Sequence, residues 1–200
     1  YDTLNRLIKK TEPLGSYQYS YDAVGNRLSF QDAKAKTVYY AYDALNRLVK
    51  TTYPDTSTVS FIYDANGNRT SMTDGLGKTS YQYDTLNRLT DYTDPFNNTV
   101  GYGYDANGNM TSIKYPDGKL VNYTYDAMNR LESVKDWLNK TTTYSYDTTG
   151  HVKGAINGNN TTVAYTYDDS GRLTGLTNSK SDATVISSYS YTLDAIGNHT

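Results

Sequence analysis

The residues best placed to do chemistry form one short stretch. It is clearest at 63–69, where the sequence reads Tyr-Asp-Ala-Asn-Gly-Asn-Arg, and at 42–47, where it reads Tyr-Asp-Ala-Leu-Asn-Arg. An aromatic ring and an acid precede a turn, Gly or Asn lies within the turn, and a base follows it. An acid beside a base could form a binding charge pair, and two neighbouring acids could divide general acid and base roles between them.

Copies of this stretch recur along the whole chain. Consecutive copies are separated by 20, 21, 21, 20, 21, 21, 21 and 21 residues, and a worn copy, Leu193-Asp194, follows after a gap of 26. A fixed period of this kind identifies a repeat array, so function must be read from the array rather than from one copy. The nine complete Tyr-Asp pairs begin at Tyr1, Tyr21, Tyr42, Tyr63, Tyr83, Tyr104, Tyr125, Tyr146 and Tyr167.

The repetition argues against a catalytic centre, and no cofactor is predicted. Equivalent surroundings give no reason for the pKa of one Asp to be raised and that of its neighbour lowered, as paired carboxylates in sugar hydrolysis require. The two histidines, His151 and His199, follow a turn where other copies carry Arg, so they are interpreted as replacements for Arg. The acid and base of each copy are expected to form a cross-strand ion pair that fixes register.

A metal site is likewise not predicted. The stretch from Asp64 to Asn68 superficially resembles a calcium loop, but its glycine comes too early and no acid closes the loop at the twelfth position. A weakly held ion on stacked Asp side chains remains the alternative.

The amino-acid composition further narrows the classes of protein and partner. Lys and Arg number 19 against 21 Asp and Glu, for a net charge of -2 without a basic stripe, which disfavours a nucleic-acid partner. There is no cysteine, and no apolar stretch approaches the roughly 20 residues that span a bilayer. The array begins in mid-motif without a capping repeat, so we expect a piece of a longer protein.

The residues before each Asp alternate between aromatic and small or polar types, as in Tyr40-Ala41-Tyr42. Successive residues of a strand point to opposite faces, so this pattern predicts strands with aromatic side chains on one face. The chain has 23 Tyr but only 3 Phe and 1 Trp, and tyrosine hydroxyls must stay wet or hydrogen-bonded. A thin layer without a thick dry core is expected.

The turns after the Asp are predicted to have two lengths. Three residues separate Asp43 from Arg47, whereas four separate Asp64 from Arg69, and the short and long forms alternate as far as Tyr125. In both forms we expect the acid to lie opposite the base, with Tyr42 opposite Leu48 and Tyr63 opposite Thr70. Gly or Asn should take the left-handed conformation. The structural motif comprises Tyr21, Asp22, Gly25, Arg27, Tyr42, Asp43, Asn46, Arg47, Tyr63, Asp64, Gly67, Arg69, Tyr83, Asp84, Asn87, Arg88, Tyr104, Asp105, Gly108, Tyr125, Asp126, Asn129, Arg130, Tyr146, Asp147, Gly150, Tyr167, Asp168, Gly171 and Arg172.

A second turn, rich in Pro, Gly and Asn, closes each unit about ten residues later. The wide gap after Leu176 holds the polar stretch 177–184, which predicts a longer loop at that turn. The fold class is therefore all-β: a continuous, twisted antiparallel sheet strip of about ten two-stranded units. Residues 1–200 are expected to form one array without an internal boundary.

These units resemble the RHS, or YD, repeats of bacterial polymorphic toxins, insecticidal toxin-complex subunits and animal teneurins. The resemblance covers the whole chain. It implies a sheet strip that spirals into a hollow shell, enclosing a toxic polypeptide in bacterial members, and a secreted or cell-surface bacterial location. Implied partners are the remaining repeats of the parent chain and its C-terminal cargo. An open fragment of such a shell is expected, since ten units are few.

The chain also departs from that family. No C-terminal Asp-Pro-x-Gly self-cleavage signature is present, because Asp94-Pro95-Phe96-Asn97 carries Asn where Gly is required, and no toxin domain is present. The leading hypothesis is a structural shell segment that is not an enzyme. The alternative is a surface module in which exposed Tyr and Asn bind a glycan or a surface protein. Strands exposed at the ends of the array could also pair edge to edge with a second copy.

Overall fold

The computed structural model describes residues 1–200 and contains eighteen β-strands. The chain divides into two compact units, residues 1–99 and 100–200, which are described separately. No helix capable of spanning a membrane is present. The strands are β1 Lys9–Glu12, β2 Gly15–Tyr21, β3 Arg27–Gln31, β4 Thr37–Tyr42, β5 Leu48–Thr52, β6 Thr58–Tyr63, β7 Arg69–Asp74, β8 Gly77–Tyr83, β9 Leu89–Thr93, β10 Thr99–Tyr104, β11 Met110–Lys114, β12 Leu120–Tyr125, β13 Leu131–Lys135, β14 Thr141–Tyr146, β15 Val152–Ile156, β16 Thr162–Tyr167, β17 Leu173–Ser179 and β18 Val185–Ser190.

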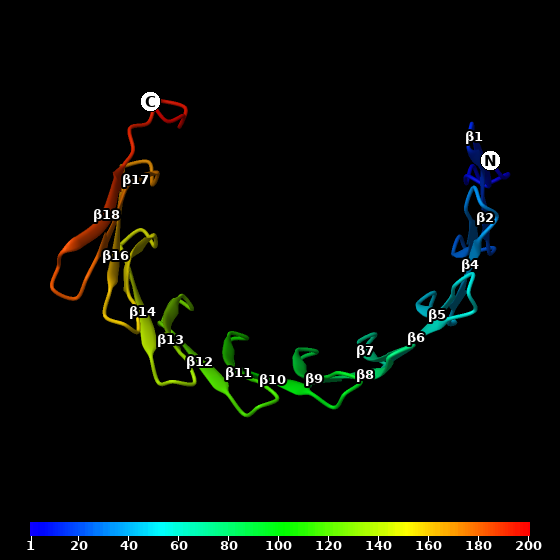
Figure 1. Ribbon diagram of the computed structural model, residues 1–200, viewed down its shortest axis with the longest axis horizontal. Coiled ribbons are helices and arrows are strands. Elements are labelled where there is room, and N and C mark those ends of the chain that lie inside the picture. The colour runs from blue at the N-terminus through cyan, green and yellow to red at the C-terminus, as the bar shows by residue number, and fades with distance from the viewer. The chain divides into compact units, whose positions relative to one another are not determined.

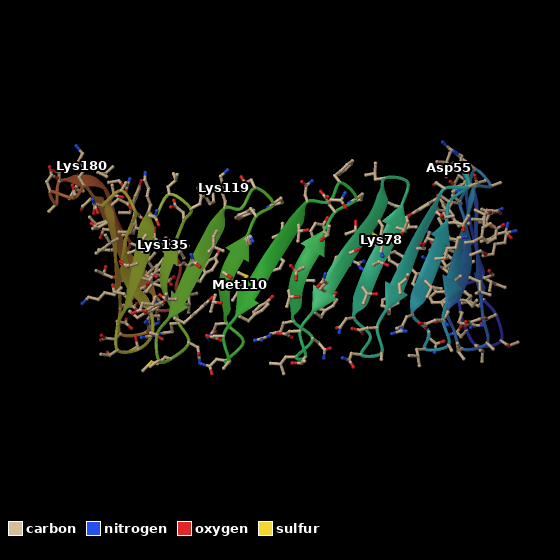
Figure 2. The ribbon with its side chains drawn as sticks, turned by 90° about the horizontal axis from the view of Figure 1, so that it is seen from below. Asp55, Lys78, Met110, Lys119, Lys135 and Lys180 are labelled. Atoms are coloured by element: carbon tan, nitrogen blue, oxygen red, sulfur yellow. The ribbon has the colours of Figure 1, made fainter.

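Within each unit, every strand pairs antiparallel with the strand before it and the strand after it in the sequence, from β1 to β9 and from β10 to β18. Figure 1 shows this consecutive order along the chain. Figure 2 shows the loops emerging at the two opposite ends of the strands. The predicted all-β antiparallel meander is confirmed, and eighteen strands agree closely with about ten two-stranded units.

The two faces of the sheet differ as predicted. Tyr19 lies opposite Phe30, and Phe30 lies opposite Val38, which gives a continuous row of large side chains. On the other face Ser20 lies opposite Ser29, and their hydroxyl oxygens are 2.6 Å apart. Aromatic pairs of the first face are in ring contact across strands, with centroid distances of 5.3 Å for Tyr19–Phe30 and 5.7 Å for Tyr81–Tyr92.

The sheet is a single layer, so it has no enclosed core. Val121, at 8% exposure, is the one buried apolar side chain, and no side chain is fully enclosed. The expectation of a thin layer is therefore confirmed. Because little area is removed from water per residue, register must be fixed by local interactions at the turns and between neighbouring strands.

Loops at the two edges share one construction, apart from the two-residue return turns between β1 and β2 and between β7 and β8. We call the loop that starts at the Asp of each Tyr-Asp pair an Asp turn, and the loop at the opposite edge a return turn. In the Asp turn 43–47, the Asp43 N–H donates to the Arg47 carbonyl at 2.9 Å and the Asn46 N–H donates to the Asp43 carbonyl at 3.0 Å. The same two bonds close the return turns 32–36, 53–57, 94–98, 115–119, 136–140, 157–161 and 180–184.

In each of these loops the residue three after the first one is left-handed, with φ of 62° at Asn46 and 91° at Gly67. This confirms the predicted role of Asn and Gly. Asp32 and Asp136 begin return turns that contain neither Pro nor Gly, so the sequence pattern did not predict turns at these positions. Their carboxylates accept backbone N–H groups of the loop, which stabilises it without those residues.

The long loop predicted for 177–184 is wrong. β17 continues to Ser179, and the return turn 180–184 has the ordinary size, closed by the Lys180 N–H to the Thr184 carbonyl at 2.8 Å. The additional residues lengthen β17 and β18, which pair from Gly175 opposite Ser190 to Ser179 opposite Val185. Alternating Thr, Asn and Ser pair as well in strands as in loops, so polarity alone did not distinguish them.

The left-handed position predicts the effect of substitution at Gly67. A Cβ added there meets no atom within 4 Å, so any destabilisation reports backbone conformation alone. We expect Gly67→Val to lower the free energy of unfolding by roughly 1–2 kcal/mol, because a β-branched residue is strained at positive φ. Gly67→Asn is the matched control, since Asn46 holds the equivalent position. Equal urea-unfolding midpoints for the two variants would contradict the assigned geometry.

Candidate functional site

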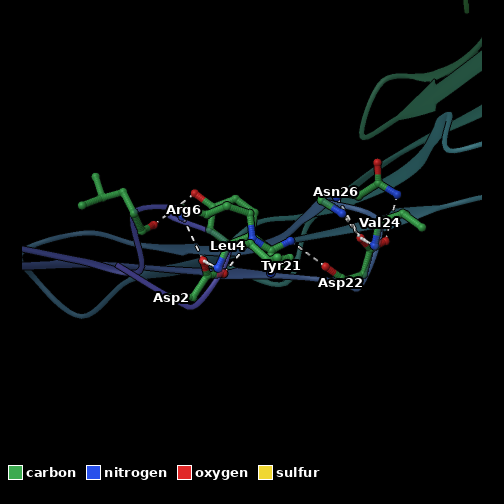
Figure 3. A network of polar contacts seen from close by, with 9 residues as sticks. Asp2, Leu4, Arg6, Tyr21, Asp22, Val24 and Asn26 are labelled. Atoms are coloured by element: carbon green, nitrogen blue, oxygen red, sulfur yellow. Dashed lines mark hydrogen bonds and ion pairs between the residues drawn. The ribbon is translucent and has the colours of Figure 1, made fainter.

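The candidate site is the Asp turn, which comes in two forms. In the first form the residue four after the Asp is Arg, as in turn 43–47. One Asp43 carboxylate oxygen accepts the N–H groups of Leu45 and Arg47 at 2.9 and 3.0 Å, and the other accepts the Arg47 Nε–H at 2.7 Å. The predicted Asp–Arg ion pair is therefore confirmed in this form. Figure 3 shows the equivalent Asp2–Arg6 pair beside the next turn.

In the second form the residue four after the Asp is Asn. Asp64 accepts the Asn68 backbone N–H at 2.8 Å and the Asn68 Nδ2–H at 2.9 Å. Arg69, the base expected there, lies one residue further on and faces Tyr63. Its guanidinium instead donates to the Tyr81 hydroxyl at 3.0 Å and lies over that ring, 4.6 Å from the centroid.

Three sequence predictions about these turns are therefore wrong. There is one loop length, not two, because Asn68 occupies the position that Arg47 occupies in its own turn. Tyr63 lies opposite Arg69, not Thr70, although Tyr42 does lie opposite Leu48 as expected. The Asp does not face a base in the Gly-Asn copies. An Asn amide donates to the carboxylate as an Arg guanidinium does, so a base is not required at this position.

Alternation of the two forms continues along the entire chain. The sequence predicted that this alternation stops after Tyr125. It does not stop when the fourth residues of successive turns are compared, because His151 occupies a position where Asn is expected. His151 is thus a replacement for Asn and not for Arg. His199 lies opposite Leu193, as Arg69 lies opposite Tyr63, so its interpretation as a replacement for Arg is confirmed. The fourth residues are, in order, Arg6, Asn26, Arg47, Asn68, Arg88, Asn109, Arg130, His151, Arg172 and Asn198.

In several copies the fourth residue also joins its Asp turn to the next one. The Arg6 guanidinium reaches from its own turn to the Asp22 backbone carbonyl at 2.8 Å (Figure 3). The Asn26 amide reaches onward to the Asn46 side-chain oxygen at 2.8 Å. The same links recur at Arg47 to Asp64, Asn68 to Asn87, Asn109 to Asn129 and Arg172 to Asp194. The residues of the repeat motif therefore form a ladder along one edge of each unit.

The motif tyrosines close the same edge of the sheet. β13 and β14 pair only from Ser133 opposite Thr143 to Lys135 opposite Thr141, which leaves their ends at the Asp turns without ladder hydrogen bonds. The Tyr146 hydroxyl spans that gap and donates to the Leu131 carbonyl at 2.8 Å. Equivalent bonds join Tyr21 to Leu7, Tyr42 to Arg27, Tyr63 to Leu48, Tyr83 to Arg69, Tyr125 to Met110 and Tyr167 to Val152.

Cations stack on these same rings. The Arg6 guanidinium lies 4.9 Å from the centroid of Tyr21, and Arg130 lies 4.3 Å from that of Tyr146. His151 stacks on Tyr167 at 4.7 Å with 25° between the ring planes. Tyr21, Tyr146 and Tyr167 each donate a hydroxyl hydrogen bond to the preceding strand and present a ring face to a side chain of the preceding Asp turn.

The turn at His151 is the one place where an acid, an imidazole and a hydroxyl meet. The Asp147 carboxylate lies 3.2 Å from His151 Nδ1, and the Thr149 hydroxyl lies 2.8 Å from that same nitrogen. A nucleophilic triad needs the acid and the hydroxyl on opposite ring nitrogens. Both groups contact Nδ1 here, so this arrangement cannot relay a proton from hydroxyl to acid through the ring.

Hydrogen bonding sets the electrostatics of the turns. The backbone N–H of Arg47 is the main cause that lowers the pKa of Asp43. The pKa of Asp64 is lowered chiefly by the Asn68 amide, without any cation. Burial raises the pKa of Tyr83 and Tyr167, which keeps their hydroxyls in the protonated form that donates. Both forms of the turn therefore hold a carboxylate anion.

The surface hollows are open and lie beside Asp turns and beside return turns. One of them, of about 680 Å³, is lined by residues that include His151, Lys153 and Tyr165. No group of three or more His, Asp or Glu side chains lies close enough together to hold a metal ion. Tyr102 and Tyr123, two tyrosines of the aromatic face, are partly buried opposite Ile113 and Val134. The observed contacts of the motif residues are structural.

Fold and ladder together define a class of protein: an antiparallel repeat sheet in which a Tyr-Asp turn recurs at one edge. The sequence matches the family described as RHS Repeat over residues 1–37, 42–79, 63–99, 83–120, 104–141 and 146–183. These segments cover most of the chain, and the chain therefore belongs to the RHS-repeat family. No curated protein sequence matches it.

Solved structures share the fold. A crystal structure of TcdB2-TccC3 without its hypervariable C-terminal region has a TM-score of 0.78 and 17% identity, covering 100% of this chain and 12% of that chain. TcdB2-TccC3-TEV gives a TM-score of 0.77 at 17% identity, with the same coverage of both chains. A Photorhabdus luminescens Tc holotoxin pore gives 0.57 at 14% identity, covering 100% of this chain and 13% of that one. The chain thus corresponds to about an eighth of their length.

The tyrosine bridges predict a difference between two positions on β14. Tyr146→Phe removes the hydrogen bond to Leu131 but keeps the ring, and we expect it to lower the free energy of unfolding by about 1 kcal/mol. Tyr144→Phe is the control, because the Tyr144 hydroxyl makes no hydrogen bond within the chain. Equal urea-unfolding midpoints for both variants would show that the bridge contributes nothing.

The lowered Asp pKa values predict an acid limit of stability. A carboxyl whose pKa is lower in the folded chain stabilises it fully above the unfolded pKa, and this stabilisation is lost as pH falls through the folded value. The melting temperature should therefore hold down to about pH 5 and fall progressively below it. Asp64→Asn should flatten that fall more than Asp169→Asn, whose carboxylate makes no hydrogen bond within the chain. Parallel acid profiles for the two variants would contradict this assignment.

Proposed function

We propose that this chain is a structural segment of a closed RHS shell whose parent protein encloses a C-terminal toxin or effector polypeptide. The observation that carries the proposal is the ladder of Asp turns along one edge of each unit, which builds a sheet without a core of its own. Such a sheet separates two spaces and offers no reaction centre. Function then comes from what the parent shell surrounds.

Exposed apolar side chains at both edges support closure. The residue two after the Asp projects from the Asp turns, and Leu45 is 67% and Leu86 is 64% exposed. The corresponding residue of the return turns projects at the other edge, where Leu76 is 72% and Phe96 is 70% exposed. At the Asp turns this position is apolar and exposed in six of the ten copies, so another part of the same strip could cover that row; the six are Leu4, Val24, Leu45, Leu86, Met128 and Ile196.

The related structures support an enclosed variable region. One of them is described as TcdB2-TccC3 without a hypervariable C-terminal region, and another as TcdB2-TccC3-Cdc42. We infer that the parent of this chain likewise carries a variable C-terminal segment, and that it is a secreted or cell-surface bacterial protein. Its remaining repeats are the principal partners of this segment. No specific contact in the structure favours the glycan-binding alternative.

The proposal is tested on the full-length parent by imaging and limited proteolysis. Electron microscopy should show a hollow particle, and the C-terminal segment should resist protease while the shell is intact. A paired Leu45→Glu and Leu86→Glu substitution should expose that segment by opening the edge contacts. The isolated 200-residue protein carrying both changes should melt as the unchanged protein does, because these side chains are exposed in it.

A solid rod or a flat sheet without a lumen would overturn the proposal. So would a C-terminal segment that is cleaved equally fast in the unchanged parent and in the doubly substituted one.

A further inference from the structure

The chain contains three Asn-Gly steps, and the structure holds one of them differently from the other two. Asn66-Gly67 and Asn107-Gly108 lie within Asp turns, where the glycine is the left-handed residue three after the Asp. Asn157-Gly158 instead begins the return turn 157–161, where the glycine is the second residue. The backbone nitrogen of the glycine therefore has different surroundings in the two settings.

An Asn-Gly step can rearrange without an enzyme, because glycine has no side chain to shield its nitrogen. That nitrogen attacks the Asn side-chain carbonyl carbon, and a new carbon–nitrogen bond closes a five-membered succinimide. The side-chain amide leaves as ammonia and takes up the proton released by the glycine nitrogen. Water then adds to either ring carbonyl and opens the ring to Asp or to isoaspartate. The reaction requires a free glycine N–H and a side-chain amide that can depart.

Both requirements are blocked in the Asp turns. The Gly67 N–H donates to the Asp64 carbonyl at 3.2 Å, and the Asn66 amide donates to the Asn87 side-chain oxygen of the next turn at 2.9 Å. Cyclisation there would have to break both bonds. The corresponding pairs in the second unit are Gly108 with Asp105 at 3.2 Å and Asn107 with Asn129 at 2.9 Å.

Asn157-Gly158 has neither of these two protecting hydrogen bonds. The Gly158 N–H has no acceptor within the chain. The Asn157 amide donates only to the Thr161 hydroxyl of its own turn, at 3.0 Å. An open hollow of about 330 Å³ lies beside the step, lined by residues that include Asp136 and Lys140, so water can reach the ring that would form.

We propose that Asn157 is a site of spontaneous deamidation, and that the ladder of Asp turns protects the other two Asn-Gly steps from it. The change adds one negative charge to a chain of net charge -2. An Asp product at position 157 fits the first position of a return turn. Asp136 holds that position in the neighbouring return turn, where it accepts the N–H groups of Leu138 and Lys140 at 2.9 Å each. An isoaspartate product inserts an extra backbone carbon and loosens the turn.

The test is peptide mapping by mass spectrometry of the folded 200-residue protein during incubation at mildly alkaline pH. The peptide carrying Asn157 should gain one mass unit at least about tenfold faster than those carrying Asn66 and Asn107, which must first break their hydrogen bonds. In strong urea the three peptides should convert at similar rates. Asn157→Gln is the control variant and should remove the fast conversion.

Gly158→Ala is unsuitable as a control, because its Cβ would lie 2.6 Å from the Lys140 Cβ and disturb the turn. Conversion of Asn66 or Asn107 as fast as Asn157 in the folded protein would overturn the proposal. So would an Asn157 that stays intact when folded while all three peptides convert in urea.

Discussion

The structure depends on one interaction, the acceptance of loop N–H groups by the carboxylate of an Asp at the end of a strand. In the turn at Asp43 this carboxylate binds the N–H groups two and four residues further on and the side chain of the fourth residue. These bonds fix the loop at three residues, and the preceding Tyr then points to the aromatic face. A single-layer sheet has no second layer to correct an error in register, so this constraint acts at every Asp turn.

The ladder also explains why Asn and Gly alternate at the left-handed position. After a turn that ends in Asn, the next turn carries Asn there, as Asn46 follows Asn26, and the two amides bond at 2.8 Å. After a turn that ends in Arg the next turn carries Gly, and the guanidinium lies beside it, 3.9 Å from a Cβ built on Gly25. His151 is followed by Gly171, where a Cβ would lie 2.8 Å from the imidazole. At Gly67, which follows Arg47, no atom lies within 4 Å of a built Cβ, so the positive φ alone favours glycine there.

Much of this fold could be predicted from the sequence because strand periodicity is a local property. The aromatic and polar faces, the left-handed Asn and Gly, and the Asp43–Arg47 pair were all predictable. The length of the turn at Asp64 was not, because counting residues to the next base ignores that Asn68 supplies an equivalent donor. The same assumption misplaced His151, which takes the place of Asn and not of Arg. The constant spacing from each Asp to the left-handed Asn or Gly was the signal in the sequence that indicates a single loop length.

The partners of the motif residues could not be predicted, because they lie in neighbouring hairpins. Nothing within the local sequence shows that the Tyr146 hydroxyl reaches Leu131 or that Arg6 reaches the Asp22 carbonyl. Such contacts depend on how consecutive hairpins pair, and here the pairing leaves the strand ends at the Asp turns without ladder bonds. Side chains that resembled a binding site in one copy therefore become connectors in the array.

The central claim is that every Asp turn has the same length, with the fourth residue in one place whether it is Arg or Asn. Scalar coupling across hydrogen bonds, measured by NMR on the labelled protein, tests this directly at the turn where sequence and structure disagree. The account predicts coupling between the Asp64 amide nitrogen and the Asn68 carbonyl carbon, matching that between Asp43 and Arg47. Coupling of the Asp64 amide to the Arg69 carbonyl would restore two loop lengths and contradict it.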